Sequence, residues 1–318
     1  MKLNRAFVLL IMLSVLASSA WGQVLPGMKR DLTYKAGDGF VDVLKADKVV
    51  GRYVYKDVQL PYVYPLSVDG GPSVTMDCGE LPLKNSAPDN WCDSPAGRSF
   101  WVGLGKLNDV DFWTPGSNNG KIVQTDLRFD SPSEQYWNIH ATYEYRNPRG
   151  KKVCSEERRY AFSSYEGGIL VSLAVIITAD VSDLTYSDSV DGLVGVKLTE
   201  GKPTITDSEG RTGMVCRGKR AAWVDCTVEA ADGKRGITMF DFPINPNYPA
   251  YWNVSEKGLM AANPFGGAAL SGDAKNDSTR KVEFGGTLLF AYLLYVHEGA
   301  ANPDAISGIA KALAAIPK

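Results

Sequence analysis

The sequence predicts an all-β protein, a large antiparallel β-sandwich that ends in a short helix. Three observations lead to this prediction. Apolar and polar residues alternate with a period of two in many short segments, turn-forming residues separate these segments, and a helical apolar pattern occurs once, at the end of the chain. Hydrophobic residues make up 44% of the 318 residues and charged residues 22%, which is typical of a globular protein.

The first 22 residues have the three zones of a secretory signal peptide. Lys2 and Arg5 are basic, Phe7–Leu16 is almost continuously apolar, and small residues stand at Ala20 and Gly22. A membrane anchor needs roughly 20 apolar residues, and this run is shorter, so we expect cleavage after residue 22. The sequence therefore predicts a periplasmic or extracellular protein that is not inserted in the membrane.

The β-strand pattern is clearest in Trp137–Arg146. Ile139 and Tyr143 lie on one predicted face, and His140 and Glu144 lie on the other, as expected for a strand with one buried and one solvated face. Similar runs predict strands at 41–44, 49–55, 122–129, 159–162, 169–179, 193–198, 223–228, 237–242 and 282–296. No linker or change of composition divides these runs, so we expect a single domain over residues 23–318.

The helix is predicted from residue 302 onward. Asn302 can cap its N-terminus, Pro303 suits its first turn, and Asp304 suits its positive end. The apolar stripe consists of Ile306, Ile309, Leu313 and Ile316. This stripe predicts that one face of the helix packs against the sandwich.

Five cysteines follow the predicted signal peptide. In an oxidising compartment some of them should pair, and the local candidates are Cys78 with Cys92 and Cys216 with Cys226, which leaves Cys154. The spacing does not fix the connectivity. The odd number leaves at least one thiol free or bonded to another chain.

The net charge and the small number of metal-ligating residues exclude several classes of function. The 34 basic and 36 acidic residues give a net charge of −2, so we expect no binding of nucleic acid or of anionic membranes. Histidine occurs only at His140 and His297, and no Cys-x-x-Cys pair occurs. We therefore expect neither a metal site nor a cofactor.

The segment from residue 90 to residue 120 is rich in side chains that recognise sugars. Its candidates are Asp93, Arg98, Trp101, Asp111 and Trp113. Aromatic faces stack on the C–H surfaces of a sugar ring, and charged groups bind its hydroxyls. The alternative is that the tryptophans fill the core and that Asp93 and Arg98 pair with each other. For the group as a whole we favour a pocket.

Further candidates occur later in the chain. Asp241 lies on an inward-facing row at the end of a strand, where a buried carboxyl becomes a proton donor with a raised pKa. Asn245 and Asn263 follow, and His297 closes the last long strand in a mostly apolar row, where a structural role is the alternative. Glu157 belongs to a run of four charged residues, 156–159, for which we expect a solvated face.

Several segments together resemble a known family. They are Val63–Leu66, Val74–Thr75, Arg98–Gly105, Val110–Trp113, Lys219–Asp225, Asp241–Pro243, Asn245–Pro246, Gly258–Gly266 and Val296–Gly299. Their order and wording resemble a secreted bacterial family that carries the label "methane oxygenase PmoA", a domain of unknown function. The resemblance covers roughly residues 51–299. It implies an all-β supersandwich similar to galactose-mutarotase-like proteins, and an association with sugar-processing enzymes.

The chain departs from the pattern of that family at its histidines. Members usually read Asp-His-Pro-His-His-Arg-Gly where this chain has residues 93–99, so Ser94, Ala96 and Gly97 replace three histidines. Phe242 replaces a fourth, and His297 is retained. The resemblance therefore implies that any chemistry based on those histidines has been lost here.

Two functions follow from these residues. The first is a carbohydrate-binding or scaffold protein of a sugar-processing system, which the missing histidines favour. The second is a carbohydrate-active enzyme of the glycoside hydrolase, lyase or epimerase type. Asp93, Asp241 or Glu157 would then be the acid or base, Arg98 would orient hydroxyls, and His297 would transfer a proton. Both require the candidate residues to converge on one pocket.

Overall fold

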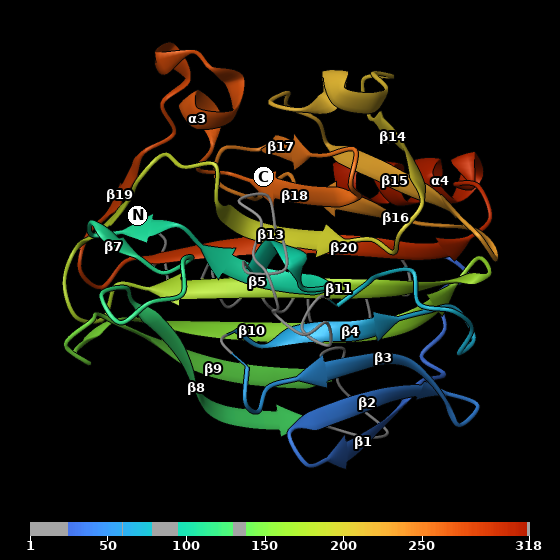
Figure 1. Ribbon diagram of the computed structural model, residues 1–318, viewed down its shortest axis with the longest axis horizontal. Helices are drawn as coiled ribbons and strands as arrows, with labels where there is room; N and C mark the ends of the chain where they lie inside the picture. The colour runs from blue at the N-terminus through green and yellow to red at the C-terminus, as the bar shows by residue number, and fades with distance from the viewer. Residues whose placement is uncertain (1–24, 59, 78–94, 130–137, 317–318) are drawn as a thin grey trace.

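The computed structural model describes residues 25–58, 60–77, 95–129 and 138–316. In these ranges the strands form two eight-stranded sheets and one four-stranded sheet, and all the pairings between named strands are antiparallel. The eight-stranded sheet that contains β1 (Thr33–Gly37), here called sheet 1, overlies the one that contains β20 (Thr287–Glu298), called sheet 2, and the strands of both run across the molecule in Figure 1. The prediction of an all-β sandwich is confirmed.

Sheet 1 has the strand order β1-β2-β3-β4-β5-β13-β18-β17. The strands are β1 Thr33–Gly37, β2 Phe40–Lys45, β3 Lys48–Val54, β4 Tyr62–Leu66, β5 Phe100–Leu104, β13 Gly192–Lys197, β17 Tyr251–Val254 and β18 Leu259–Asn263. The runs predicted at 41–44, 49–55 and 193–198 are β2, β3 and β13. The short strands β4 and β17, of five and four residues, were not predicted, because too few residues alternate in them to give a recognisable period of two.

Sheet 2 has the order β14-β15-β16-β20-β11-β10-β9-β8. The strands are β8 Lys121–Phe129, β9 Ile139–Arg146, β10 Lys152–Tyr165, β11 Gly168–Thr178, β14 Lys202–Asp207, β15 Trp223–Ala230, β16 Gly233–Asp241 and β20 Thr287–Glu298. Burial alternates residue by residue along β9, as predicted for that segment. The other predicted runs in this sheet also form strands.

Sheet 3 is small and has the order β19-β12-β6-β7. Its strands are β6 Lys106–Leu107, β7 Val110–Asp111, β12 Leu184–Tyr186 and β19 Arg280–Val282. The run predicted as one strand at 282–296 is divided, because β19 pairs with β12 while β20 pairs with β11 and β16. A turn separates them, in which Gly285 has a φ of +79°.

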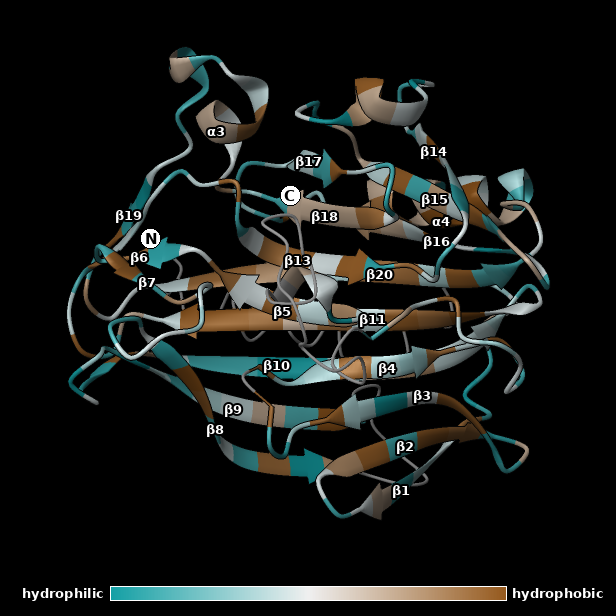
Figure 2. Ribbon diagram, in the orientation of Figure 1, coloured by the Kyte–Doolittle hydropathy of each residue, from teal (hydrophilic) through white to brown (hydrophobic). Residues whose placement is uncertain are grey.

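The main core fills the space between sheets 1 and 2, and a second hydrophobic cluster lies on the outer face of sheet 2 beneath helix α4, Pro303–Ala314. Along β20, Phe290 and Leu294 belong to the first cluster, and Leu289 and Leu293 belong to the second. Figure 2 accordingly shows β11 and β20 as hydrophobic along much of their length. A strand covered on both faces has no solvated row.

Helix α4 begins as the sequence predicts. The Asn302 side chain accepts hydrogen bonds from the backbone N–H groups of Asp304 and Ala305, and Ile306 and Ile309 are buried. The short helix α3, Gly267–Ser271, was not predicted. Within the described ranges no helix is both long enough and apolar enough to cross a membrane. The predicted signal peptide, residues 1–22, lies outside them.

Cys216 and Cys226, one of the two candidate local pairs, are not joined, because both are free thiols, as is Cys154. Cys226 faces the core from β15, whereas Cys216 lies in a single turn between β14 and β15 and its thiol donates to the Arg211 carbonyl. The elements therefore hold the two side chains in different surroundings. The other local pair, Cys78 with Cys92, lies outside the described residues.

Candidate functional site

A polar groove on the outer face of sheet 1 is lined by one of the predicted site residues, Arg98. Its centre is Arg98, which lies just before β5 and follows a single turn at Pro95–Gly97. Arg98 Nη1 donates to Asp77 Oδ1 at 2.9 Å, and the Tyr62 hydroxyl donates to Asp77 Oδ2 at 2.5 Å. Tyr62 reaches this position because β4 pairs with β5, with Tyr62 opposite Trp101.

Within this cluster the Arg98 side chain is more exposed to solvent than the carboxylate that holds it. The Asp77 side chain is 3% exposed, whereas the Arg98 side chain is 30% exposed. The guanidinium carbon of Arg98 lies 5.4 Å from the centre of the Tyr62 ring. Burial and the hydrogen bond to Asp77 raise the pKa of Tyr62, so its hydroxyl stays a proton donor to that carboxylate. Asp77 thus fixes Arg98 while leaving guanidinium N–H groups available to a ligand.

The groove itself is a cavity of about 580 Å³. Besides the Arg98 cluster, its lining includes Phe40, Arg52, Tyr64 and Pro65. Arg52 makes two hydrogen bonds to Asp42, at 2.6 and 3.1 Å, and its guanidinium carbon lies 3.9 Å from the centre of the Phe40 ring. The cavity therefore combines two carboxylate-held arginines with aromatic side chains.

The two predicted tryptophans lie next to this groove but are buried. Trp101 is 2% exposed and Trp113 is 7% exposed, and their rings make an edge-to-face contact at 4.7 Å. Both indoles lie against glycines: a Cβ atom on Gly195 would come within 2.3 Å of Trp101, and one on Gly103 within 2.8 Å of Trp113. Trp101 lies on β5 and not in a loop, and the two rings form a hydrophobic base beside Tyr62.

Asp111 has a local structural contact in β7. Its Oδ1 accepts hydrogen bonds from the backbone N–H groups of Trp113, at 2.7 Å, and Thr114, at 3.0 Å. Partial burial acts to raise the pKa of Asp111, but these hydrogen bonds outweigh it and lower the pKa. Asp111 therefore fixes the turn that carries Trp113. Asp93, the other acidic candidate of this segment, lies outside the described residues.

Asp241, Asn245 and Asn263 are buried in the interior. Asn245 Nδ2 donates to Asp241 Oδ1 at 2.6 Å, and the Ala250 N–H donates to Asp241 Oδ2 at 2.7 Å. Burial raises the pKa of Asp241 to about 7. Asn263 donates to the Ser189 carbonyl and accepts from the Phe265 N–H. These amide groups satisfy neighbouring backbone groups in the interior.

Glu157 and His297 lie on sheet 2. Glu157 is hydrogen-bonded to Arg159 at 2.6 Å, and a nitrogen of His140 lies 3.9 Å away. The interaction with His140 and the hydrogen bond from Arg159 outweigh burial and lower the pKa of Glu157 to about 2. His297 is 2% exposed, and its Nε2 lies 3.1 Å from Asp225 Oδ1. The described candidates therefore lie on different sheets or in the interior, and do not share one pocket.

The charge run 156–159 differs from the expected solvated face. Alternation along β10 turns Glu156 and Arg158 into the core, where they form an ion pair with both side chains at 0% exposure. Tyr145 donates to Glu156 at 2.6 Å, and the guanidinium carbon of Arg158 lies 4.2 Å from the centre of the Tyr143 ring. These partners replace water at Glu156 and at Arg158 Nε, whereas Arg158 Nη1 and Nη2 are buried without a hydrogen-bond partner, so the pair is costly to bury.

Sequence reasoning did not identify Asp77, Tyr62 or Arg52 as site residues. The alternation of Tyr62 and Tyr64 around a valine could have indicated an aromatic outer face on β4. No local sequence pattern indicates Asp77, because it reaches Arg98 only through the pairing of distant strands.

Within the described ranges, no three His, Cys, Asp or Glu side chains are grouped so that they could hold a metal ion.

Comparison with known proteins gives matches to solved structures at low identity. A glycoside hydrolase family 97 enzyme from Pseudoalteromonas sp. strain K8, in complex with acarbose, is 12% identical with a TM-score of 0.43; the match covers 84% of this chain and 36% of that one. A heparan sulfate lyase mutant from Pedobacter heparinus is 13% identical with a TM-score of 0.38, covering 83% and 34%. This chain therefore spans about a third of the length of these enzymes.

A galactose mutarotase-like protein from Clostridium acetobutylicum is 9% identical with a TM-score of 0.30, and the match covers 83% of this chain and 94% of that one. No curated protein matches the sequence. A model of the family of unknown function DUF6807 matches residues 40–311. That match takes in most of the sandwich and nearly all of α4, and the chain belongs to the DUF6807 family.

Proposed function

We propose that this protein binds a carbohydrate in the groove of sheet 1. The observation that carries the proposal is the Arg98–Asp77–Tyr62 cluster at the surface of a cavity of about 580 Å³. A guanidinium held by a buried carboxylate presents fixed N–H donors, which suit the hydroxyl groups of a sugar. Tyr64 and Phe40 offer aromatic surface to its C–H groups. The volume is within the usual range for small-ligand sites.

Binding is better supported than acid–base catalysis. An acid and a base must both reach the scissile bond of one bound sugar. Asp241 is buried in the interior, Glu157 and His297 belong to sheet 2, and Asp77 is already paired with Arg98. Two further carboxylates line the groove, Asp38 and Asp57, and Asp38 is an exposed partner of Lys56. The fixed groups of the groove are therefore those of the Arg98–Asp77–Tyr62 cluster, which suit binding. We propose a binding or scaffold protein of a sugar-processing system.

We also propose that the chain is exported and that residues 23–318 form a single domain. The basic start, the apolar run and the small residues before position 23 support export. Mass spectrometry of the protein recovered from a bacterial periplasm or medium would identify its N-terminus. A mature protein that keeps Lys2 and Arg5 would contradict this proposal.

The binding proposal is tested first by a glycan array on the mature protein, followed by calorimetric titration of the best glycan. Arg98→Lys keeps the charge near Asp77 but removes the planar fork of donors, so we expect about tenfold weaker binding. Tyr64→Ala should also weaken binding, because it removes aromatic surface from the groove wall.

The matched control is Arg128→Lys, an exposed arginine on sheet 2 that lies outside the groove and should leave glycan binding unchanged. Thermal melting of each variant separates loss of binding from loss of folding. Wild-type affinity in both folded groove variants would place the glycan elsewhere. Release of a new reducing end from the glycan would show catalysis instead of binding.

A further inference from the structure

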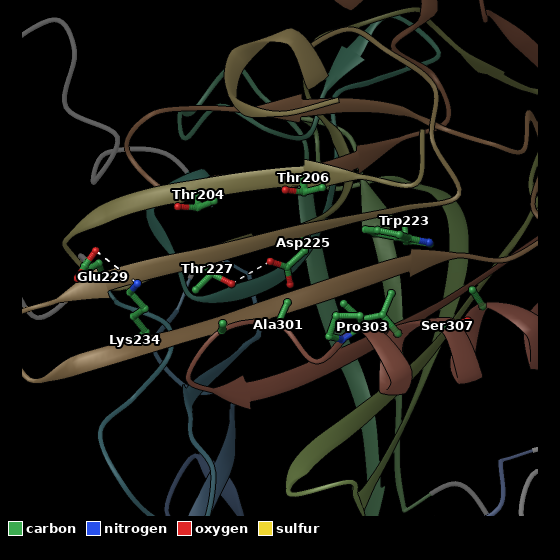
Figure 3. Close-up of a pocket in the computed structure, with 13 residues that line it drawn as sticks. Thr204, Thr206, Trp223, Asp225, Thr227, Glu229, Lys234, Ala301, Pro303 and Ser307 are labelled. Carbon is green, nitrogen blue, oxygen red and sulfur yellow. Dashed lines mark hydrogen bonds and ion pairs between the residues drawn. The ribbon is translucent and has the colours of Figure 1, made fainter. Parts of the chain in front are cut away.

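A second cavity, also of about 580 Å³, lies on the outer face of sheet 2 beside α4. Figure 3 shows its two walls. One wall is formed by side chains of β14 and β15, among them Thr204, Thr206 and Thr227, and the other by the segment that leads into α4 and by α4 itself. It is separate from the groove of sheet 1, because the whole sandwich core lies between the two outer faces.

The floor of this cavity is a fixed carboxylate, that of Asp225. Its Oδ1 accepts from the Thr238 hydroxyl at 2.8 Å and from His297 Nε2 at 3.1 Å, and its Oδ2 accepts from the Thr227 hydroxyl at 2.9 Å. The Asp225 side chain is 7% exposed, and Asp225 lines the cavity. With one donor on Oδ2, this oxygen can accept another hydrogen bond from a ligand.

His297 acts behind Asp225 as a positioning residue. The imidazole lies over Gly236 on the neighbouring strand, where a Cβ atom would come within 2.7 Å of the ring. Glycine at this position lets the ring lie against the sheet and reach Asp225. His297 does not line the cavity, so its contribution to a ligand passes through the carboxylate.

The lining selects the charge of a ligand. Lys234 is the lining cation, and it stands half-exposed with its Nζ 3.8 Å from Glu229 Oε2. An anion would therefore meet the buried Asp225 carboxylate without a buried cation to balance it. A cation would be attracted by Asp225, and Trp223, which also lines the cavity, offers a ring face for a cation–π contact.

The opposite wall selects the body of the ligand. It consists mostly of aliphatic groups, including those of Ala301, Pro303 and Ile306. A molecule with hydroxyls on all sides would leave some of them without a hydrogen-bond partner against this wall, which disfavours its binding. A hydrocarbon stem would fill the same space favourably. The threonine hydroxyls of the other wall can accept hydrogen bonds from N–H groups.

We propose that this cavity binds a small molecule with a primary ammonium group on a largely apolar body. The ammonium donates to Asp225 Oδ2 and to neighbouring threonine hydroxyls, and the body lies between Trp223 and the start of α4. A free alkylamine has both features, whereas an amino sugar has the ammonium group on a polyhydroxylated body, so comparing the two tests the aliphatic wall separately from Asp225. The site is independent of the proposed carbohydrate groove.

The test is calorimetric titration of the full mature protein with an isosteric series: n-hexylamine, n-hexanol and hexanoate, together with glucosamine and glucose. We expect saturable binding of hexylamine, and binding at least about tenfold weaker for hexanol and hexanoate, since neither can donate a charged hydrogen bond to Asp225. We also expect hexylamine to bind more tightly than glucosamine; binding of glucosamine alone would contradict the apolar body of the proposed ligand.

Asp225→Asn is nearly isosteric and should weaken amine binding at least tenfold, whereas Asp126→Asn, at an exposed carboxylate on β8 outside the cavity, should change it less than twofold. Since Asp225→Asn also disturbs His297, a second variant is needed. Ser307→Trp fills the cavity from an exposed position on α4 and should abolish binding in a folded protein. The proposal is overturned if no amine binds, if hexanoate or hexanol binds as tightly as hexylamine, or if the folded Ser307→Trp variant binds normally.

Discussion

At the residue scale, two buried acidic side chains, Glu156 and Asp241, have different hydrogen-bonding partners. Glu156 has Arg158 and Tyr145 as partners, so it forms an ion pair in the core. Asp241 has the Asn245 amide and a backbone N–H, and these partners are too weak to offset burial, so its pKa rises to about 7. Burial without an ion-pair partner therefore raises the pKa of the Asp241 carboxyl.

The raised pKa of Asp241 predicts a pH dependence of stability. An unfolded aspartate has a pKa of about 3.9, so between about pH 4 and 7 the folded protein keeps a proton that the unfolded chain releases. Asp241 therefore favours the folded state most below pH 4 and loses this contribution as the pH rises through 7. Asp241→Asn removes this titration.

Urea denaturation from pH 4 to 8 measures the effect. We expect the free energy of unfolding of the wild type, relative to that of Asp241→Asn, to fall from about pH 4 to pH 7 and then to level off. A constant difference between the two proteins over this range would show that Asp241 titrates normally in the folded state.

At the scale of elements, the packing of α4 on β20 forms part of the cavity at Asp225. β20 lies between β16 and β11, and its outward row supports α4, which in turn forms one wall of the cavity at Asp225. The position of α4 depends on Asn302, whose side chain accepts from two backbone N–H groups at the start of the helix. Capping therefore affects both stability and the shape of the cavity.

Asn302→Ala should lower the free energy of unfolding by about 1 kcal/mol, because it leaves two N–H groups at the helix start without their acceptor. Asn302→Asp keeps an acceptor and should restore most of the loss. Chemical denaturation of the three proteins measures this difference. Equal stability of the alanine variant and the wild type would show that the cap contributes nothing.

At the scale of the whole molecule, the continuous core determines the state of the thiols. Cys154, Cys216 and Cys226 are buried, and burial raises the pKa of each, to about 11 for Cys216. The thiolate is the reactive form, so both access and protonation protect these residues.

We expect iodoacetamide to leave these three cysteines unmodified in the folded protein and to modify all three after denaturation without a reductant. Peptide mapping by mass spectrometry distinguishes them. Recovery of a peptide pair joined through Cys216 and Cys226 would contradict the free thiols.

The local sequence pattern was sufficient to predict an element where the burial of its residues follows from the period of that one strand or helix. The alternation in β9, the apolar run of β11 and the cap of α4 each predicted an element correctly, because period and turn chemistry act over a few neighbouring residues. Arg98, which lines the proposed groove, was predicted as a site residue from its aromatic and acidic surroundings in the sequence. Asp77, which fixes Arg98, could not be identified, since 21 residues separate the two and the contact requires the assembled sheet.

The sequence by itself determined the all-β class, most long strands, the terminal helix and the polar, aromatic character of one segment. Only the tertiary structure decided which distant side chains meet, Arg98 with Asp77 on one sheet and His297 with Asp225 on the other. It also decided that the row of β10 that carries Glu156 and Arg158 faces the core. The physical reason is range. Alternation assigns a residue to a face, but the pairing of distant strands decides what that face covers and which partner replaces water.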